Sequence, residues 1–393
     1  MRIGIDATTW WNRRGFGRYT RLLLTHMFAA APDHEFVVFI DQAPAPEMLR
    51  DNIRIVQVKT AATVTEAAVA SGSRALTDLW AFRKAVAAEP LDVMYFPAVY
   101  SWYPTGGKAP VVITFHDAIA EHYSALVFPD VRGRLMWAAK IWLAKRSARM
   151  ITTVSEAARE EIIRYQKIPR ERITVVTEAA DPIFRPRIDR DKMDATRQRL
   201  GLDPKARLLV YVGGLAPHKN LLRLIKAFAL AARDPALADF LLVFVGDPEG
   251  GGFYSHFAEI SALVEAEPLL EDRVRFTGFV SDEDLVSLYS DAAVVAMPAL
   301  SEGFGLPAAE AIACGTPVIA ARGGAVEEVV GEAGLFFDPL SIEEIAQTIL
   351  VIGSDTVRLD HLRAATLPRA ARLSWSRAAT EMLQVLTKCG GNR

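Results

Sequence analysis

Short apolar runs alternate with longer segments of helical periodicity along the first half of the chain. Each run is apolar throughout rather than alternating, which is typical of strands that helices bury on both faces of a parallel sheet. The first half therefore predicts an α/β unit. Its predicted strands are Ile3–Asp6, Phe36–Ile40, Ile53–Val58, Asp92–Phe96, Val111–Phe115, Met150–Val154 and Ile173–Val176.

The pattern breaks at residues 181–206, where three prolines and many charges are typical of a linker with one short helix. A second α/β series follows the break. We predict an N-terminal domain over 1–185, a linker over 186–206, a C-terminal domain over 207–373 and a final helix within 374–393. Ligands of open α/β sheets bind at the carboxyl ends of the strands, so we expect a cleft between the two domains. The second set of predicted strands is Leu208–Val212, Leu241–Val245, Val274–Phe276, Val294–Met297, Pro317–Ala320 and Leu335–Phe337.

The end of the chain predicts one more amphipathic helix, over Ser374–Lys388. Its apolar residues Trp375, Ala378, Met382 and Leu386 recur at helical spacing. Two placements are open: the helix packs on its own domain, or it bridges to the first domain.

The composition is that of an ordinary globular protein, with 51% hydrophobic and 23% charged residues among 393. Cys314 and Cys389 can form no disulfide framework and lack metal-site spacing, so we expect a reducing, cytoplasmic compartment. We expect neither a signal peptide nor a spanning helix, which needs roughly 18 apolar residues.

Net charge is −2, which argues against a nucleic-acid-binding protein. Residues 1–180 carry a net charge of +5 and residues 181–393 a net charge of −7, so the first half is the candidate for an anionic partner. Within it, residues 131–149 hold six basic residues, no acidic residue, and Trp137 and Trp142. That combination favours peripheral contact with an anionic membrane. A solvated basic helix over the core is the alternative.

The strongest motif is residues 301–316, SEGFGLPAAEAIACGT. A turn at Gly303–Gly305 precedes Pro307, which suits the first position of a helix that would end at Gly315. The N–H groups and the positive dipole end at the start of this helix would form a site for a diphosphate.

Two carboxylates flank that turn. Glu302 precedes it, and Glu310 lies inside the predicted helix. Carboxylates are good acceptors for hydroxyl groups, so we infer sugar hydroxyls as their partners. The alternative is a solvated loop residue at 302 and a favourable helix-dipole interaction at 310.

Residues 209–220, LVYVGGLAPHKN, form a second motif. A buried strand runs into Gly213 and Gly214, and His218 and Lys219 then stand at the head of a helix. Lys219 would supply a positive charge for a phosphate, and the glycines would allow close approach of a ligand. The spacing is not that of a P-loop. A solvated lysine in a first helical turn is the alternative.

Residues 10–20, WWNRRGFGRYT, predict a loop with Gly15 and Gly17 that could close over a phosphate or an acceptor; a plain turn between strand and helix is the alternative. The arginines of this loop are Arg13, Arg14 and Arg18. His116 and Asp117 follow the run Val111–Phe115 and should face the cleft. A structural histidine and a capping aspartate are the alternative.

Together these segments resemble the family 4 retaining glycosyltransferases of the GT-B fold. The pattern EGFGLP…E…ACGTPVI carries the resemblance, with YVGGL..HKN and FTGFVSDEDLVSLY before it. MRIGID, GFGRYT, VVITFHD, TVSEAAREEI and the closing LSW helix occupy the family's order. The resemblance implies two Rossmann-like domains, the first for the acceptor and the second for the donor. It also implies transfer of a hexosyl group from a nucleotide sugar to a glycan or lipid-linked acceptor in polysaccharide or glycoconjugate biosynthesis.

The resemblance further implies roles by position. Glu310 would hold the ribose hydroxyls and Glu302 the hydroxyls of the transferred sugar. Lys219 would neutralise the leaving diphosphate, and His116 would lie near the reacting sugar. The remaining residues expected at the donor are Gly15, Gly17, Gly213, Gly214, His218, Phe279, Val280, Gly303, Phe304, Gly305 and Leu306.

The chain departs from the family pattern in two places. Many members carry an arginine where this chain has Gly214, so His218 or Arg18 would have to provide the second positive charge. The segment 177–180, Thr-Glu-Ala-Ala, replaces the usual Asn-Gly after the seventh strand.

The Lys-Asn pair after the YVG strand favours GDP-mannose as the donor, with UDP-hexoses as the other option. No Asp-x-Asp metal clamp stands out, so we expect no metal and no other cofactor. The alternatives are a sugar-nucleotide epimerase of the same fold and a non-catalytic nucleotide-sugar-binding scaffold. A nicotinamide oxidoreductase is disfavoured, because no dinucleotide fingerprint follows a strand.

Overall fold

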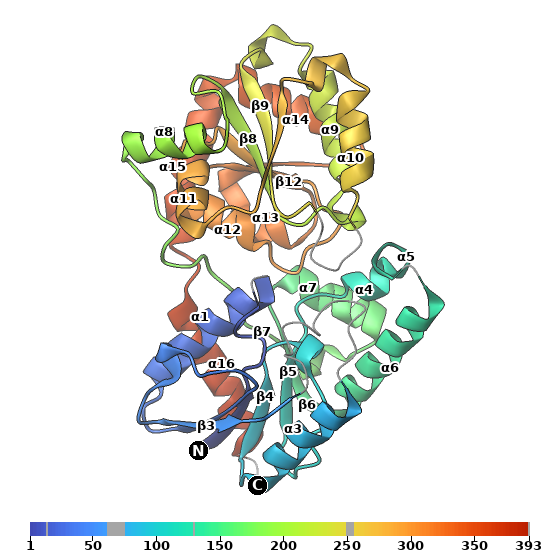
Figure 1. The fold of residues 1–393 in the computed structure, drawn as a ribbon, viewed down its shortest axis with the longest axis vertical. Helices are drawn as coiled ribbons and strands as arrows, with labels where there is room; N and C mark the ends of the chain where they lie inside the picture. Colours follow the sequence, from blue (N-terminus) through green and yellow to red (C-terminus); the bar gives the residue numbers. More distant parts are fainter. Residues whose placement is uncertain (13–14, 61–74, 129, 249–254, 392–393) are drawn as a thin grey trace. The chain divides into compact units, whose positions relative to one another are not determined.

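The chain forms two compact units in the computed structural model (Figure 1). The first unit comprises residues 1–178 with 374–393, and the second comprises residues 179–373. Each unit is built on one parallel sheet. The structure describes all residues except 13–14, 61–74, 129, 249–254 and 392–393.

The sheet of the first unit has the strand order β3-β2-β1-β4-β5-β6-β7. All its described pairings are parallel, so the predicted sheet type is confirmed. Each strand lies within two residues of its predicted bounds, because continuous apolar runs identify doubly covered strands. The strands are β1 (Arg2–Asp6), β2 (Glu35–Ile40), β3 (Ile53–Gln57), β4 (Val93–Phe96), β5 (Val111–Thr114), β6 (Ala148–Thr153) and β7 (Ile173–Val175).

Helices cover both faces of this sheet. Alternate side chains of a strand point to opposite faces. Met94 and Phe96 of β4 share a core with the helices after β3 and β5, whereas Tyr95 meets Tyr19 of the helix after β1. The described helices of the first unit are α1 (Gly15–Ala30), α3 (Leu76–Ala88), α4 (Ile119–His122), α5 (Ser124–Val127), α6 (Val131–Ser147), α7 (Glu156–Glu161) and α16 (Trp375–Gly390).

The last helix, α16, packs along α1 in the first unit (Figure 1). The side chain of Ser374 caps it by accepting from the backbone N–H of Arg377. Its buried stripe includes Trp375, Met382 and Leu386. The Trp375 ring lies 6.0 Å from the ring of Tyr19. The chain therefore returns to its first unit to complete that unit's core.

The sheet of the second unit has the order β10-β9-β8-β11-β12-β13 and is also parallel. Each predicted strand of this series is present. The strands are β8 (Arg207–Val212), β9 (Phe240–Val245), β10 (Val274–Gly278), β11 (Val294–Met297), β12 (Val318–Ala321) and β13 (Gly334–Phe337).

The core of the second unit joins the sheet to the helices that flank it. Leu224 and Phe228 of α9 pack with Ile345 and Ile349 of α14 over Phe244.

Among the described helices of either unit, none is both long and apolar enough to span a membrane. The described helices of the second unit are α8 (Arg190–Arg199), α9 (Leu221–Ala231), α10 (Phe257–Glu265), α11 (Asp282–Asp291), α12 (Leu306–Ala313), α13 (Ala325–Val330), α14 (Ile342–Ser354) and α15 (Thr356–Ala370).

The segment 186–206 contains α8, which is held against α11. Arg197 is buried and pairs with Asp291, and the Thr196 hydroxyl donates to Asp284 at 3.2 Å. These contacts make 186–206 part of the second unit's packed structure.

Candidate active site

The strand order of the second sheet reverses between β8 and β11. The chain runs outward from β8 through β9 to β10, and then returns to the other side of β8 at β11. The loops that follow β8 and β11 are therefore neighbours, at the kind of edge where open α/β sheets bind ligands. The backbone N–H of Leu300 donates to the carbonyl of His218 at 2.9 Å, which ties the two loops together.

Lys219 and Glu302 meet at this edge. Lys219 ends the short helix η5 (Pro217–Lys219) after β8, and Glu302 lies in the loop after β11. The Lys219 Nζ donates to Glu302 Oε1 at 2.6 Å, with side chains 20% and 16% exposed. An ammonium has three donors and a carboxylate has two acceptor oxygens, so each group keeps capacity for another partner. The sequence motifs that predicted these two residues thus come together in space.

Asn220 fixes the position of this pair. It is 4% exposed and adopts the left-handed conformation, with φ 62°. Its side-chain amide donates to the carbonyls of Pro298 at 3.1 Å and Pro339 at 2.7 Å. One buried side chain therefore joins the loops after β8, β11 and β13. Sequence reasoning missed this role, because the partners lie 78 and 119 residues away.

His218 is an uncharged neighbour of the pair. Burial, reinforced by the charge of Lys219, lowers the pKa of His218 to about 3. The imidazole is therefore neutral at neutral pH, which disfavours His218 as the source of the second positive charge. Its Nδ1 is buried, and no hydrogen-bond partner lies within reach among the described residues. A buried polar atom of this kind is suited to a ligand hydrogen bond.

Glycines line the carboxyl end of β8 and β9. Gly213 has φ 147°, and a Cβ there would lie 2.9 Å from the Tyr211 hydroxyl. A Cβ on Gly246 would lie 2.1 Å from the carbonyl of Gly213. Gly214 is exposed, and its carbonyl accepts from the Tyr211 hydroxyl at 2.6 Å. The positive φ thus favours glycine at 213, close backbone packing requires glycine at 246, and Gly214 lies open at the edge.

The start of α12 lies next to Glu302 in the chain. Gly305 caps the helix with φ 92°, and a Cβ there would lie 2.8 Å from Val326, so glycine is required. Pro307 occupies the first turn, as predicted from the sequence. The three other predicted members of this turn, Gly303, Phe304 and Leu306, are buried. The turn is therefore rigidly packed and holds the N-terminus of α12 at the carboxyl edge of the sheet.

Glu310 lies one turn further along α12 and is 4% exposed. The Tyr289 hydroxyl of α11 donates to its Oε2 at 3.1 Å. At the end of β10, the ring of Phe279 is 72% exposed and Val280 is buried. These residues lie where the sequence placed them, on the second unit, with Tyr289 as an additional partner.

In the first unit, His116 follows β5 and has an acceptor at each ring nitrogen. Its Nε2 donates to the carbonyl of Pro97 at 3.0 Å, and its Nδ1 lies 3.4 Å from Glu178 Oε1. Asp117 accepts from the backbone N–H of Ile119 at 3.0 Å. Asp117 thus forms a local turn before α4, and it is not the capping aspartate of the alternative interpretation, because Ala118 is the N-cap.

The loop predicted over residues 10–20 is wrong in its second half, because α1 begins at Gly15. Gly15 is exposed at the helix start. A Cβ on Gly17 would lie 2.0 Å from the carbonyl of Asn12, so this glycine makes room for the chain itself. Arg18 lies within α1. Arg13 and Arg14 lie outside the described residues.

Two α/β units, each on a parallel sheet of Rossmann-like order, form the architecture of the GT-B class. Comparison with family models agrees with this class. Residues 192–366 match the model "Glycosyl transferases group 1", and residues 13–182 match "Glycosyltransferase Family 4". The chain belongs to glycosyltransferase family 4.

Two relatives agree with that assignment, and a solved structure shares the fold. A D-inositol 3-phosphate glycosyltransferase of Rhodococcus opacus is 33% identical, over 74% of this chain and 67% of the relative. The O-antigen chain mannosyltransferase B of Escherichia coli is 30% identical, over 69% of this chain and 68% of the relative. The crystal structure of Anabaena Alr3699/HepE with UDP and glucose superposes with a TM-score of 0.72 at 19% identity, covering 99% of this chain and 100% of that one.

Proposed function

We propose that this glycosyltransferase moves a hexosyl group from a nucleotide sugar to a glycan or lipid-linked acceptor, with retention at the anomeric carbon. Mannose from GDP-mannose is the favoured donor, and a UDP-hexose is the other. The observation that carries the proposal is the Lys219–Glu302 pair at the reversal point of the second sheet. The mannosyltransferase named among the relatives supports the donor, and the HepE complex keeps UDP-sugars as the second option.

The pair divides the work between the two ends of the bond that breaks. Glu302 takes one Lys219 N–H, so two remain for oxygens of the departing diphosphate. The second carboxylate oxygen of Glu302 accepts a hydroxyl of the transferred sugar. Negative charge grows on the diphosphate as the bond breaks. The Lys219 ammonium therefore attracts the diphosphate more strongly in the transition state than in the ground state, which lowers the barrier.

Neighbouring groups complete the proposed donor site. Backbone N–H groups at the start of α12 add partial positive charge toward the diphosphate. Glu310 accepts the ribose hydroxyls beside Tyr289, and the exposed Phe279 lies near the base. The Nδ1 of His218, which has no hydrogen-bond partner in the described part of the chain, adds one neutral hydrogen bond.

The proposed transfer needs no metal ion. The bond from the anomeric carbon to the phosphate oxygen breaks, and the acceptor oxygen bonds to the same face of that carbon. The acceptor's hydroxyl proton passes to the leaving phosphate oxygen. Lys219 and the helix amides balance the charge that a metal would otherwise balance. Full activity in excess chelator is the expected result. Strict dependence of the activity on Mg²⁺ or Mn²⁺ would refute the proposed metal-independent transfer.

We also propose that α6 rests on an anionic membrane that presents a lipid-linked acceptor at the cytoplasmic face. Arg132 and Arg146 of this helix are exposed, and the Arg146 guanidinium lies 4.9 Å from the centre of the Trp142 ring. α3 packs on the same core and exposes two more large apolar residues. The exposed large apolar side chains of the two helices are Leu76, Trp80, Val131, Leu135, Met136, Trp142 and Leu143.

Sedimentation with lipid vesicles tests the membrane contact. Leu135→Glu combined with Trp142→Glu should abolish binding to vesicles that contain anionic lipid, because apolar insertion and charge attraction are both lost. Leu340→Glu is the matched control, since Leu340 is 62% exposed on the second unit. Equal sedimentation of both variants, or no binding by the wild type, would refute the contact.

A melting-point panel of UDP-, GDP-, ADP- and TDP-sugars, followed by product analysis, tests the function itself. The true donor should raise the melting point through binding to the folded state. Incubation with acceptor should then release the nucleoside diphosphate. An altered sugar on the same nucleotide without acceptor would indicate an epimerase, and binding without turnover on any acceptor would indicate a scaffold.

A further inference from the structure

Glu178 is a buried carboxyl group that the proposed donor site does not use. It follows β7 and is 3% exposed. Burial raises its pKa, and the hydrogen bond and charge of His116 oppose that rise. It stands in the segment 177–180, where this chain departs from the family's usual Asn-Gly. A buried carboxyl is costly to keep without a partner, so its contact is informative.

The two contacts of His116 limit where its protons can lie. The carbonyl of Pro97 can only accept, so Nε2 of His116 must carry a hydrogen. Nδ1 then faces Glu178 Oε1 at 3.4 Å, close enough for the two groups to share one proton. The proton lies either on the carboxyl, beside a neutral imidazole, or on the imidazole, beside a carboxylate. In both states the pair has no net charge.

The surroundings hold the imidazole in one orientation. The Tyr19 ring meets it edge-on, with centroids 4.6 Å apart. The Tyr19 hydroxyl points instead to Tyr95 at 3.1 Å and to Thr114 at 3.3 Å. Tyr19 therefore packs on the His116 imidazole without hydrogen-bonding to it, and Glu178 is left as the proton partner of Nδ1.

We propose that Glu178 is the positioning residue of His116: it holds the imidazole through a shared proton at the carboxyl end of β5. The proposal rests on the proposed function and on the family resemblance, which implies that His116 lies near the reacting sugar. Glu178 touches no substrate itself and acts through the orientation and proton of His116. Histidines in metal sites are oriented by second-shell carboxylates in a comparable way.

A double-mutant cycle tests this coupling. Glu178→Gln keeps the shape of the side chain but cannot share a proton with His116. It should lower kcat by about tenfold to a hundredfold, the usual cost of losing a carboxylate that orients a functional histidine. KM should change little. In the His116→Asn background the same substitution should cost nothing more. Equal losses in both backgrounds, or normal turnover of His116→Asn, would overturn the proposal.

Glu121→Gln is the matched control. Glu121 is another largely buried carboxyl of the first unit whose pKa burial raises, and its partner is the Trp137 Nε1 at 2.9 Å. It should change stability without changing kcat, and its effect should add to that of His116→Asn. A kcat loss as large as that of Glu178→Gln would mean that any buried carboxyl of the unit matters, which contradicts a specific role.

The ¹⁵N shifts of the His116 ring give a readout that needs no turnover. Nδ1 should show a shared proton in the wild type and in Glu121→Gln, and the value of a bare acceptor in Glu178→Gln. An unchanged Nδ1 shift in Glu178→Gln would refute the shared proton. If the wild type transfers no sugar from any donor, the proposed function fails, and this spectrum still decides whether Glu178 holds His116.

Discussion

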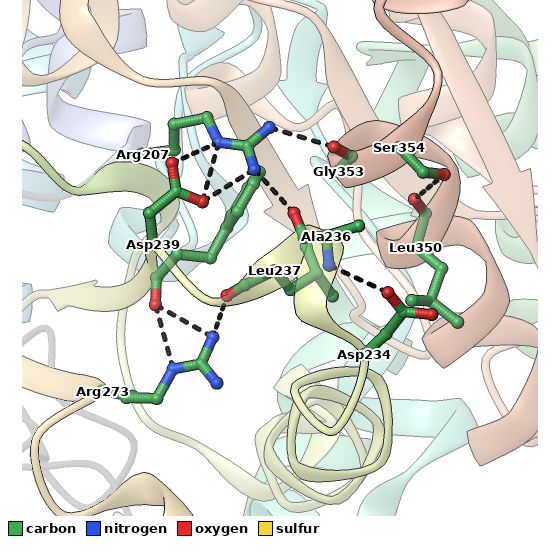
Figure 2. Close-up of polar contacts among 10 residues, drawn as sticks. Arg207, Asp234, Ala236, Leu237, Asp239, Arg273, Leu350, Gly353 and Ser354 are labelled. Atoms are coloured by element: carbon green, nitrogen blue, oxygen red, sulfur yellow. Dashed lines mark hydrogen bonds and ion pairs between the residues drawn. The ribbon is translucent and has the colours of Figure 1, made fainter.

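The two edges of the second sheet use charged side chains in opposite ways. At the amino-terminal edge, Arg207 pairs with Asp239 at 2.7 Å and donates to the carbonyls of Ala236 and Gly353 (Figure 2). Arg273 donates to the carbonyls of Leu237 and Phe240 beside them. The protein itself satisfies these guanidinium donors.

The carboxyl-terminal edge keeps hydrogen-bonding capacity for a ligand. Lys219 gives one donor to Glu302, and the buried Nδ1 of His218 has no partner among the described residues. Gly213 and Gly305, which follow β8 and β11, both have positive φ values that favour glycine. The comparison teaches that charge at the first edge stabilises the fold, whereas charge at the second is available for chemistry.

Lys219→Ala should produce the largest change. We expect kcat to fall by about a hundredfold to a thousandfold, or about 3–4 kcal/mol, because the growing charge on the diphosphate loses its counter-ion. The melting point should move by only a few degrees. Lys226→Ala, at an exposed position of α9, is the control and should behave as the wild type. Normal turnover by Lys219→Ala would show that the charge at the carboxyl-terminal edge is not used in catalysis.

Asn220→Ala should affect both activity and stability. The carbonyls of Pro298 and Pro339 lose a buried donor, which costs about 1–3 kcal/mol. The loop that carries Lys219 loosens as well, so kcat should fall by about tenfold for a misplacement of about 1 Å or less. Thermal unfolding and steady-state kinetics measure the two effects. A loss of stability with unchanged kcat would show that the Asn220 hydrogen bonds do not position Lys219 and Glu302.

Arg207→Ala should lower stability and leave catalysis intact. It leaves the carbonyls of Ala236 and Gly353 without their donor, and the side chain is 35% exposed, so we expect a loss of about 1–2 kcal/mol. The variant should melt lower but show wild-type kcat at temperatures where it is folded. A tenfold drop in kcat would mean that the two edges are not independent.

The smallest expected effect is a pH dependence. Arg207 lowers the pKa of Asp239 in the folded state. The pair therefore stabilises the protein above the ordinary aspartate pKa of about 3.9, and this contribution is lost as the pH falls through the folded value. The stability gap between wild type and Arg207→Ala should narrow below about pH 4. A constant gap from pH 7 to pH 3 would show that the charge of Asp239 contributes nothing.

The sequence predicted the strands and the second-unit motifs well, for a physical reason. Strands covered on both faces must be apolar throughout, so Val294–Met297 could be located from composition alone. The loops after parallel strands lie at one edge of the sheet, so Lys219 and Glu302 could both be assigned to strand ends, whereas their ion pair became visible only in the structure. Helical spacing likewise located the helix at Trp375.

Contacts that depend on side-chain direction could not be predicted. The amide of Asn220 reaches two distant loops, and nothing in the local sequence indicates those partners. The start of α1 was misplaced, because Gly15 and Gly17 suggested a loop while the packing of Gly17 on Asn12 supports a helix. The partner of His116 emerged only when β5 and β7 were placed in one sheet.

Calorimetric binding of GDP and GMP, and of UDP and UMP, to the wild type and to Lys219→Ala tests the central claim most directly. The lysine should hold the outer phosphate, so the wild type should bind the diphosphate of the correct base at least about tenfold more tightly than the monophosphate. Lys219→Ala should bind the two forms about equally. A variant that keeps the wild-type preference for the diphosphate would contradict the account.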